Sequence, residues 1–389
     1  MNFASRIKGL GPEGAYSVMA LASALEKEGR DIIHLEIGQP DFGTFPEIIQ
    51  AGKDAIDAGF TRYNPPEGYA DLRETIAQYS QRRSILADPS QVVVAPGAKP
   101  VLLFPMLALV EPGDEVLYPD PGFPSYRSTI ELAGGTPVPV PLIEANSFSF
   151  DLGALAARIS PRTKLLILNS PANPTGGVIP KADLETIARL AQKHDFWVMS
   201  DEIYSRLVYD NIKAESIYAI DGMADRTIVV DGFSKSYAMT GWRLGYAVMP
   251  EELARKVSLL ITHAVGCTAG FTQKAGVAAI EQSDRYIAEI IELYQRRRNR
   301  FIHGLNQIDG LNCRLPEGAF YAFVNTSALG IPSAKLAERL LQEAGVACVS
   351  GTDFGKNGEG YVRFSYATSS DQLQSAVERI ADFVNKLLR

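Results

Sequence analysis

The chain has 389 residues, of which 46% are hydrophobic and 21% are charged, which is the composition of a soluble globular protein with a sizeable core. Its 38 basic and 45 acidic residues give a formal charge of -7 at pH 7, which argues against a nucleic-acid partner. The most apolar run, residues 101–110, is interrupted by Pro105 and is too short to span a bilayer, so we expect no membrane partner. The three cysteines fit neither a disulfide framework nor a metal site, and the first residues lack the apolar core of a signal peptide. We therefore expect a cytoplasmic protein without a metal centre.

The first pattern in the chain is Gly9-Leu10-Gly11-Pro12-Glu13-Gly14, which satisfies the G-x-G-x-x-G rule for dinucleotide binding. That function requires a buried strand before the glycines, and residues 1–8 do not form one. We therefore expect a loop followed by a helix over 15–28, and a nicotinamide oxidoreductase remains an outside alternative.

The following elements indicate an α/β fold. A short strand over 31–35 and a helix over 46–58 come first. From about residue 90, strands and helices alternate, with apolar strands expected at 91–95, 114–118, 164–168, 196–200 and 227–230 and a helix over 181–194. The alternation predicts a mostly parallel sheet with helices on both faces, in which ligands bind at the carboxyl ends of the strands. Beyond it we expect helices over 251–282 (interrupted at 266–270), 284–308, 334–344 and 372–388, and strands over 319–325 and 361–366.

The strand over 227–230 ends just before a lysine that has unusual surroundings in the sequence. Lys235 is accompanied by Phe233, Tyr237 and Trp242, and a lysine that these rings enclose loses hydration, which favours its neutral, nucleophilic amine. Eight residues later, Arg243 supplies a permanent planar cation suited to a phosphate. An amine that condenses with an aldehyde, next to a cation that binds phosphate, describes a site for pyridoxal 5′-phosphate.

The whole string from Gly232 to Gly245, GFSKSYAMTGWRLG, resembles the cofactor-attachment signature of the class I aminotransferases, the aspartate aminotransferase family of fold type I, and follows the wording of its bacterial subgroup. The resemblance implies an α/β fold with a large domain whose mostly parallel, seven-stranded sheet is flanked by helices. Residues 45–285 would form this cofactor-binding domain, and residues 1–44 and 286–389 a smaller α+β domain.

By this resemblance, one group of residues binds the cofactor phosphate. Gly97, Ala98 and Lys99 open a helix whose first backbone N–H groups face the anion. Arg243 binds the same phosphate, and Ser234 is a cofactor-binding neighbour of the attachment lysine. From the residues alone, the segment 97–99 is also compatible with an ordinary turn between a strand and a helix.

A second group surrounds the cofactor ring. Phe123 stacks on the pyridine, and Asn173, in an Asn-Pro-Thr-Gly segment, donates to the phenolic oxygen together with Tyr204. Asp201, in an Asp-Glu-x-Tyr segment, keeps the pyridine nitrogen protonated so that the ring accepts electrons. An aromatic after Pro-Gly is also a common core residue, so Phe123 has that second interpretation.

The substrate is expected to meet Gly38, Asn173 and Arg363. Gly38 belongs to a segment that resembles the family's G-x-P-D-F pattern, where the glycine backbone lies beside the substrate carboxylate. Arg363 alternates with apolar residues on a strand, and a buried charge there needs a partner, which the α-carboxylate of an amino acid provides. A glycine–proline turn and a structural salt bridge are the alternatives for Gly38 and Arg363.

The family's Y-x-P-x-x-G-x-x-x-L-R pattern is met by Tyr63, Pro65, Gly68, Leu72 and Arg73. The resemblance places the Tyr63 hydroxyl on the cofactor phosphate of the neighbouring subunit, which implies a homodimer with shared sites. Taken alone, Tyr63 is also compatible with a simple turn aromatic.

The implied function is ping-pong transfer of an amino group between an L-amino acid (aspartate, aromatic or another) and a 2-oxo acid. Lys235 is the Schiff-base lysine and general base, assisted by Asp201 and Tyr204. The alternative is a lyase on the same scaffold, a C–S β-lyase or a cyclopropane-forming synthase, which would keep all of these residues. A non-catalytic regulatory module is disfavoured, because such modules usually come fused to a DNA-binding segment and we expect no room for one in this chain.

Two departures from the family pattern bear on specificity. Gly232 stands where many relatives carry a serine that donates to the phosphate. Residues 262–272 contain His263 but no arginine, whereas animal-type aspartate aminotransferases use an arginine from this region for the distal carboxylate. Acidic substrates are therefore neither excluded nor supported by the sequence.

Overall fold

The computed structural model describes residues 3–7 and 10–389. Gly9, the first glycine of the G-x-G-x-x-G pattern, lies outside these ranges, and α1 (Gly14–Lys27) begins at its last glycine. Within the described ranges, no helix is both long enough and apolar enough to cross a membrane.

One large sheet holds eight strands in the order β2-β9-β8-β7-β6-β3-β4-β5. The five strands β8, β7, β6, β3 and β4 are parallel to their neighbours in this series, whereas β9 is antiparallel to both β2 and β8. The strands span Val92–Ala95 (β2), Glu115–Asp120 (β3), Thr136–Ile143 (β4), Ser149–Phe150 (β5), Thr163–Asn169 (β6), Trp197–Asp201 (β7), Thr227–Gly232 (β8) and Gly245–Val248 (β9). The expected mostly parallel sheet is confirmed.

The sheet has one strand more than the seven expected. The extra strand, β5, pairs antiparallel with the end of β4 at the sheet edge. Ser147 and Phe148 both adopt positive φ, which turns the chain back directly after β4. A two-residue strand carries no hydrophobic period, so it leaves no signal in the sequence.

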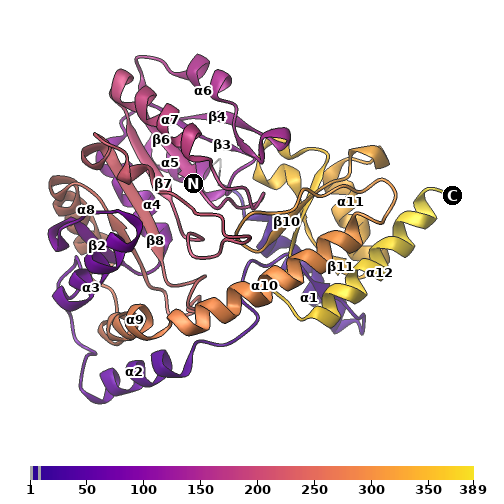
Figure 1. The fold of residues 1–389 in the computed structure, drawn as a ribbon, viewed down its shortest axis with the longest axis horizontal. Helices are drawn as coiled ribbons and strands as arrows, with labels where there is room; N and C mark the ends of the chain where they lie inside the picture. Colours follow the sequence, from indigo (N-terminus) through magenta and orange to yellow (C-terminus); the bar gives the residue numbers. More distant parts are fainter. Residues whose placement is uncertain (1–2, 8–9) are drawn as a thin grey trace.

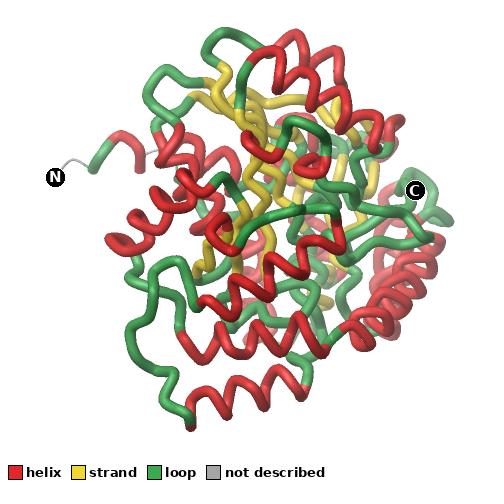
Figure 2. The backbone as a smooth tube through the Cα atoms, turned by 60° about the vertical axis from the view of Figure 1, so that its left-hand side comes forward, coloured by secondary structure: helices red, strands yellow, loops and turns green. Residues whose placement is uncertain are grey.

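Helices cover both faces of the sheet, as Figure 2 shows with helices in red around the yellow strands. The alternation along each strand decides which face a residue serves. Val93 and Ile228 pack in one core with α4 (Ala98–Leu109), α5 (Ser125–Ala133) and α8 (Glu251–Ala264). Val94 and Val229 face the other side, where α3 (Ala70–Ser80) and α9 (Gly270–Gln282) lie, and α6 (Leu152–Arg158) and α7 (Lys181–His194) continue that layer.

A second group of elements follows α10 (Asp284–Leu305), which runs from α9 toward α12 (Ser370–Leu387) in Figure 1. Its antiparallel sheet has the order β10-β13-β12, formed by Tyr321–Asn325, Tyr361–Ser365 and Val349–Ser350. Near the N-terminus, β1 (Ile33–His34) pairs with β11 (Val346–Ala347), so this N-terminal strand packs with the C-terminal part of the chain. The remaining helices are α2 (Pro46–Asp57), which packs on α9, and α11 (Ser333–Arg339). The predicted boundaries at 45 and 285 fall beside the first residues of α2 and α10, and the division into two domains stays a prediction.

Candidate active site

Three parallel strands end side by side with polar residues. Asn169 at the end of β6 is paired in register with Asp201 at the end of β7, and Asp201 is in turn paired with Val230 of β8. Lys235 lies in the turn that follows β8, and Asn173 lies four residues beyond the end of β6. The structure thus gathers these predicted site residues at the carboxyl edge of the large sheet, where open α/β folds bind ligands.

The Lys235 amine is held in a pocket of aromatic rings and backbone. Its Nζ donates to the Gly38 carbonyl oxygen at 2.6 Å and lies 6.0 Å from the centre of the Tyr204 ring and 5.9 Å from that of Phe320. Burial, followed by the positive charges of Arg363 and Arg243, lowers the pKa of Lys235 from 10.5 to about 8. A sizeable neutral fraction near physiological pH is what a nucleophilic amine needs.

The Asp201 carboxylate is buried next to a hydroxyl and a backbone amide. Tyr126 Oη donates to its Oδ2 at 2.7 Å, and the Ile203 N–H donates to its Oδ1 at 3.2 Å. Burial is the main reason why the pKa of Asp201 rises to about 6. A fixed carboxylate with such a pKa is suited to hold a proton on a heteroaromatic nitrogen.

The start of α4 and Arg243 together form a cradle for an anion. Gly97 caps α4 at a φ of +94°, and a Cβ placed on it would come within 2.3 Å of Arg243 Nη2. The guanidinium therefore lies against the first turn of α4, whose N–H groups have no partner inside the helix. Arg243 is kept there by a bond from its Nη1 to the Thr240 carbonyl oxygen at 2.9 Å. A guanidinium facing free helix N–H groups fits the phosphate of pyridoxal 5′-phosphate.

The other predicted phosphate and ring residues lie around this cradle. Lys99 uses its side chain elsewhere, in an ion pair with Glu13, and its Nζ is 5.6 Å from the centre of the Phe123 ring. Ser234 is partly buried in the lysine turn. Tyr63, in contrast, is 96% exposed on this chain, so it is not gathered with the other residues.

Arg363 on β13 is only 3% exposed and has no carboxylate partner in the described part of the chain. Its Nη1 donates to Asn173 Oδ1 at 3.0 Å and its Nη2 to the Glu36 carbonyl oxygen, whereas its buried Nε has no hydrogen-bond partner among residues 3–7 and 10–389. The Tyr321 ring lies 4.5 Å from the guanidinium carbon. Burial lowers the pKa of Arg363. A buried guanidinium whose hydrogen-bond partners are neutral is suited to bind a carboxylate.

Several residues of this site were not expected from the sequence. Tyr126 bonds to Asp201, Tyr321 Oη lies 2.7 Å from Tyr204 Oη, and Phe320 flanks Lys235. A Cβ on Gly38 would come within 2.0 Å of Tyr321 Oη, so this tyrosine also explains the need for glycine there. Phe320 and Tyr321 lie in an apolar stretch that is typical of ordinary core, and Tyr126 lies in the helix start after Pro124, where a buried tyrosine is common too. The one available signal is that Tyr126 follows Phe123 by three residues, which places both rings on one side of a helix start.

Among the described residues, no group of three histidine, cysteine, aspartate or glutamate side chains is placed to hold a metal ion.

Comparisons with known proteins agree with this geometry. The family model described as "Aminotransferase class I and II" matches residues 30–380. An aspartate aminotransferase of Pyrococcus abyssi is 43% identical over 355 residues, which cover 90% of this chain and 91% of that protein. An aromatic-amino-acid aminotransferase 2 of Thermococcus litoralis is 40% identical and covers 98% of this chain and 97% of its own length.

Solved structures give the same result for the fold. The aspartate aminotransferase from Thermus thermophilus with maleate superposes with a TM-score of 0.94 at 37% identity, covering 98% of this chain and 99% of that one. The expected resemblance, the fold type and the dependence on pyridoxal phosphate are thereby confirmed. The chain belongs to the class I and II aminotransferases and is a pyridoxal-phosphate-dependent enzyme of that family.

Proposed function

We propose that this aminotransferase exchanges an amino group between an L-amino acid and a 2-oxo acid at Lys235, and that Arg363 binds the α-carboxylate of both. The supporting observation is the Arg363 guanidinium, which is buried, contacts Asn173 and makes no ion pair with a carboxylate among the described residues. A carboxylate is the ligand that complements it in charge and in geometry. Gly38 connects Lys235 with the surroundings of Arg363. Its carbonyl oxygen accepts from Lys235, and its Cα lies against Tyr321, whose ring packs on the Arg363 guanidinium.

The protein contributes positioning and proton transfer. When bound, pyridoxal 5′-phosphate supplies a carbonyl carbon that takes the amino group and a ring that accepts electrons. Lys235 Nζ, with its lowered pKa, takes the proton from the substrate Cα. Asp201 holds the proton at the ring nitrogen, and Tyr204 and the Asn173 amide donate to the phenolic oxygen. Asn173 Oδ1 already accepts from Arg363, which leaves its amide N–H groups free to donate.

We assign the phosphate to Arg243 and to the backbone of Gly97, Ala98 and Lys99, with Ser234 alongside. This assignment is supported by the contact between Gly97 and the Arg243 guanidinium. Phe123 is proposed to stack on the ring, where its neighbour Tyr126 reaches Asp201 from the same helix start. Offset stacking contributes roughly 0.5–1.5 kcal/mol beyond area burial.

We further propose a homodimer in which Tyr63 serves the partner's site. A groove of about 710 Å³ opens beside the phosphate cradle, and its lining includes Pro96, Arg243, and Ile49 and Ile56 of α2. The isoleucines and Tyr63 are exposed on the single chain. Apolar residues exposed next to a charged site are suited to cover by a second subunit.

The test is a panel of amino donors offered with 2-oxoglutarate, pyruvate or oxaloacetate. The relatives named aspartate and aromatic-amino-acid aminotransferases make aspartate, phenylalanine and tyrosine the first donors to try. We expect amino transfer that needs an oxo acid and that Lys235→Ala abolishes. Pyruvate release from cysteine conjugates without an oxo acid would instead indicate the lyase, which the comparisons do not support.

We also propose a cytoplasmic location. Its support is that Cys267, Cys313 and Cys348 are all unpaired, and free thiols persist in reducing compartments. Cell fractionation of the native host with a specific antibody would test it.

A further inference from the structure

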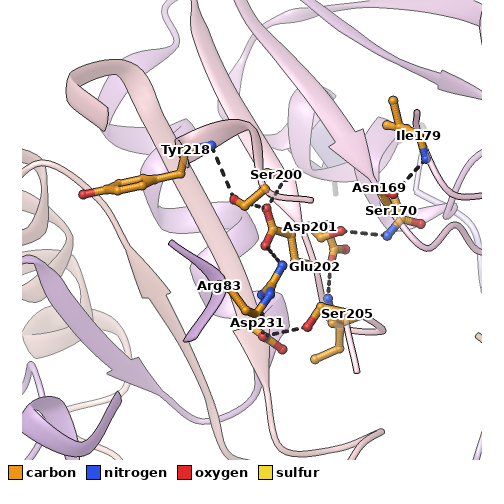
Figure 3. Close-up of polar contacts among 12 residues, drawn as sticks. Arg83, Asn169, Ser170, Ile179, Ser200, Asp201, Glu202, Ser205, Tyr218 and Asp231 are labelled. Carbon is orange, nitrogen blue, oxygen red and sulfur yellow. Dashed lines mark hydrogen bonds and ion pairs between the residues drawn. The ribbon is translucent and has the colours of Figure 1, made fainter. Parts of the chain in front are cut away.

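Behind the carboxyl ends of β7 and β8, three acidic side chains are buried close together. They are Asp201, Glu202 and Asp231. Arg83 forms ion pairs with two of them, Glu202 and Asp231. It comes from the short helix η2 (Gln81–Arg83), far earlier in the chain. Arg83 Nη2 pairs with Glu202 and its Nη1 lies 3.6 Å from Asp231 Oδ2, as Figure 3 shows.

The two carboxylates are anchored where β7 and β8 end beside the site. Glu202 directly follows β7, and its Oε1 accepts from Ser200 Oγ and Ser216 Oγ at 2.7 Å each. Asp231 Oδ1 accepts from the Gly232 N–H at 2.7 Å, at the end of β8 and three residues before Lys235. Any change in the charge of this cluster is therefore made directly behind the proposed catalytic groups.

Arg83 leaves the cluster with an excess of negative charge. Two buried carboxylates share one guanidinium, and Asp201 adds a third negative charge beside them. In keeping with this, burial and the neighbouring carboxylates outweigh Arg83 and raise the pKa of Asp231 to about 7, and Glu202 helps to raise the pKa of Asp201. The other titratable groups that act on the two aspartates or share their surroundings are Tyr79, Tyr126, Tyr237, Tyr246, Arg206 and Lys235.

We propose that Arg83 is a positioning residue of the aminotransferase reaction, because its guanidinium sets the negative potential that Glu202 and Asp231 impose on Asp201 and on the cofactor bound against it. The inference rests on the proposed role of Asp201. Arg83 acts on substrate and cofactor through the carboxylates of Glu202 and Asp231, without touching either ligand itself.

The test is a pH titration of the visible absorbance of the bound cofactor in the purified holoenzyme. Arg83→Met removes a positive charge, so the cofactor and Asp201 should keep their protons to higher pH. The absorbance transition should move upward by on the order of one pH unit. Glu202→Gln removes a negative charge while the side chain keeps nearly the same shape, and it should move the transition to lower pH. The double variant Arg83→Met/Glu202→Gln should return it close to the wild-type pH.

Arg226→Met is the matched control. The Arg226 side chain is 26% exposed, against 15% for Arg83, but it precedes β8 at the opposite end of the strand and pairs with the exposed Asp195 instead of the buried carboxylates. It should leave the transition in place. Glu202→Gln keeps the test decisive if Arg83→Met fails to fold, since its shift has the opposite sign.

Transitions at the wild-type pH in the folded single variants would overturn the inference, and so would a double variant that retains a shift. A failure of the proposed function is recognised separately, because the wild-type protein would then lack either the cofactor band or amino transfer.

Discussion

The Arg363 guanidinium loses most of its hydration at 3% exposure and regains only neutral partners, Asn173 and the Glu36 carbonyl. We expect Arg363→Lys to lower kcat/KM by roughly 100-fold or more, about 2–3 kcal/mol, because an ammonium cannot replace a two-point contact with a carboxylate. The loss should appear mainly as a higher KM for both amino and oxo acids, measured by steady-state kinetics.

A matched lysine substitution separates this effect from a general one. Arg255→Lys changes an exposed arginine that pairs with Glu251 one turn away on α8. Its kinetic constants should remain those of the wild type. If KM for the oxo acid stayed within twofold in Arg363→Lys, the carboxylate assignment would be wrong.

The lowered pKa of Lys235 predicts a pH profile for loading the enzyme with cofactor. The neutral amine is the nucleophile, so the rate must rise with pH through the amine's pKa and level off above it. With burial and two cations lowering that pKa to about 8, we expect a midpoint near pH 8 in the cofactor-free protein. Stopped-flow absorbance after adding pyridoxal phosphate measures this rate. N-α-acetyllysine is the control and should still be rising at pH 10; a protein profile that followed it would refute the lowered pKa.

The place of a residue that follows an apolar strand is predicted well from this sequence, and the place of a residue that joins the site through space is not. Lys235 and Asp201 follow apolar strands, and the strand ends alone place them at one edge of the sheet. Tyr126 and Tyr321 carry no such signal, because a buried tyrosine that reaches a catalytic group has the same local sequence as one that does not. Their roles become visible only in the contacts with Asp201 and Tyr204.

At the scale of single elements, the sequence predicts existence better than extent. The helix over 181–194 is observed as expected. The strand expected over 31–35 contains only two paired residues, because β11 offers it no longer partner. The helix expected over 334–344 finishes in one π-helical turn, Leu340–Ala344. Tertiary partners fix such ends, and no local pattern encodes them.

The anion cradle at α4 yields a prediction about Gly97. Gly97→Ala would push a methyl group against Arg243 Nη2 and strain the positive φ, so the guanidinium would leave the helix end. We expect cofactor affinity to fall by about tenfold or more, since charge-assisted bonds contribute roughly 1.5–3 kcal/mol each. Equilibrium titration of the cofactor-free protein with pyridoxal phosphate measures this.

Gly113→Ala is the control, because Gly113 has a φ of +105° but open space around its Cα. Both variants should lose similar thermal stability, on the order of 1 kcal/mol from backbone strain. Only Gly97→Ala should bind the cofactor more weakly. Equal cofactor affinity in the two variants would show that Arg243 does not depend on the approach of the helix end.

At the scale of the whole molecule, the chain returns to its beginning. β1 pairs with β11 more than 300 positions later, and Arg363 of β13 donates to Glu36 in the N-terminal part. The sequence predicts the strands over 31–35 and 361–366, but it predicts neither β11 nor its pairing with β1, because more than 300 residues separate the two partners. The same limit applies to contacts with a second subunit. Tyr63, the residue expected to serve the partner's site, is 96% exposed on the single chain.

A shared site has a consequence that can be measured in mixed dimers. If Tyr63 serves the partner's site, a dimer of one Lys235→Ala chain and one Tyr63→Ala chain contains one site with both lesions and one with neither. Coexpression of the two should therefore give about a quarter of wild-type activity per chain, from half heterodimers with one intact site each. Lys235→Ala mixed with Arg363→Gln is the control, because both lesions lie in a chain's own site and no intact site can form. Activity equal to the sum of the separate variants in the first mixture, with heterodimers verified by mass, would place Tyr63 in its own chain's site or outside any site.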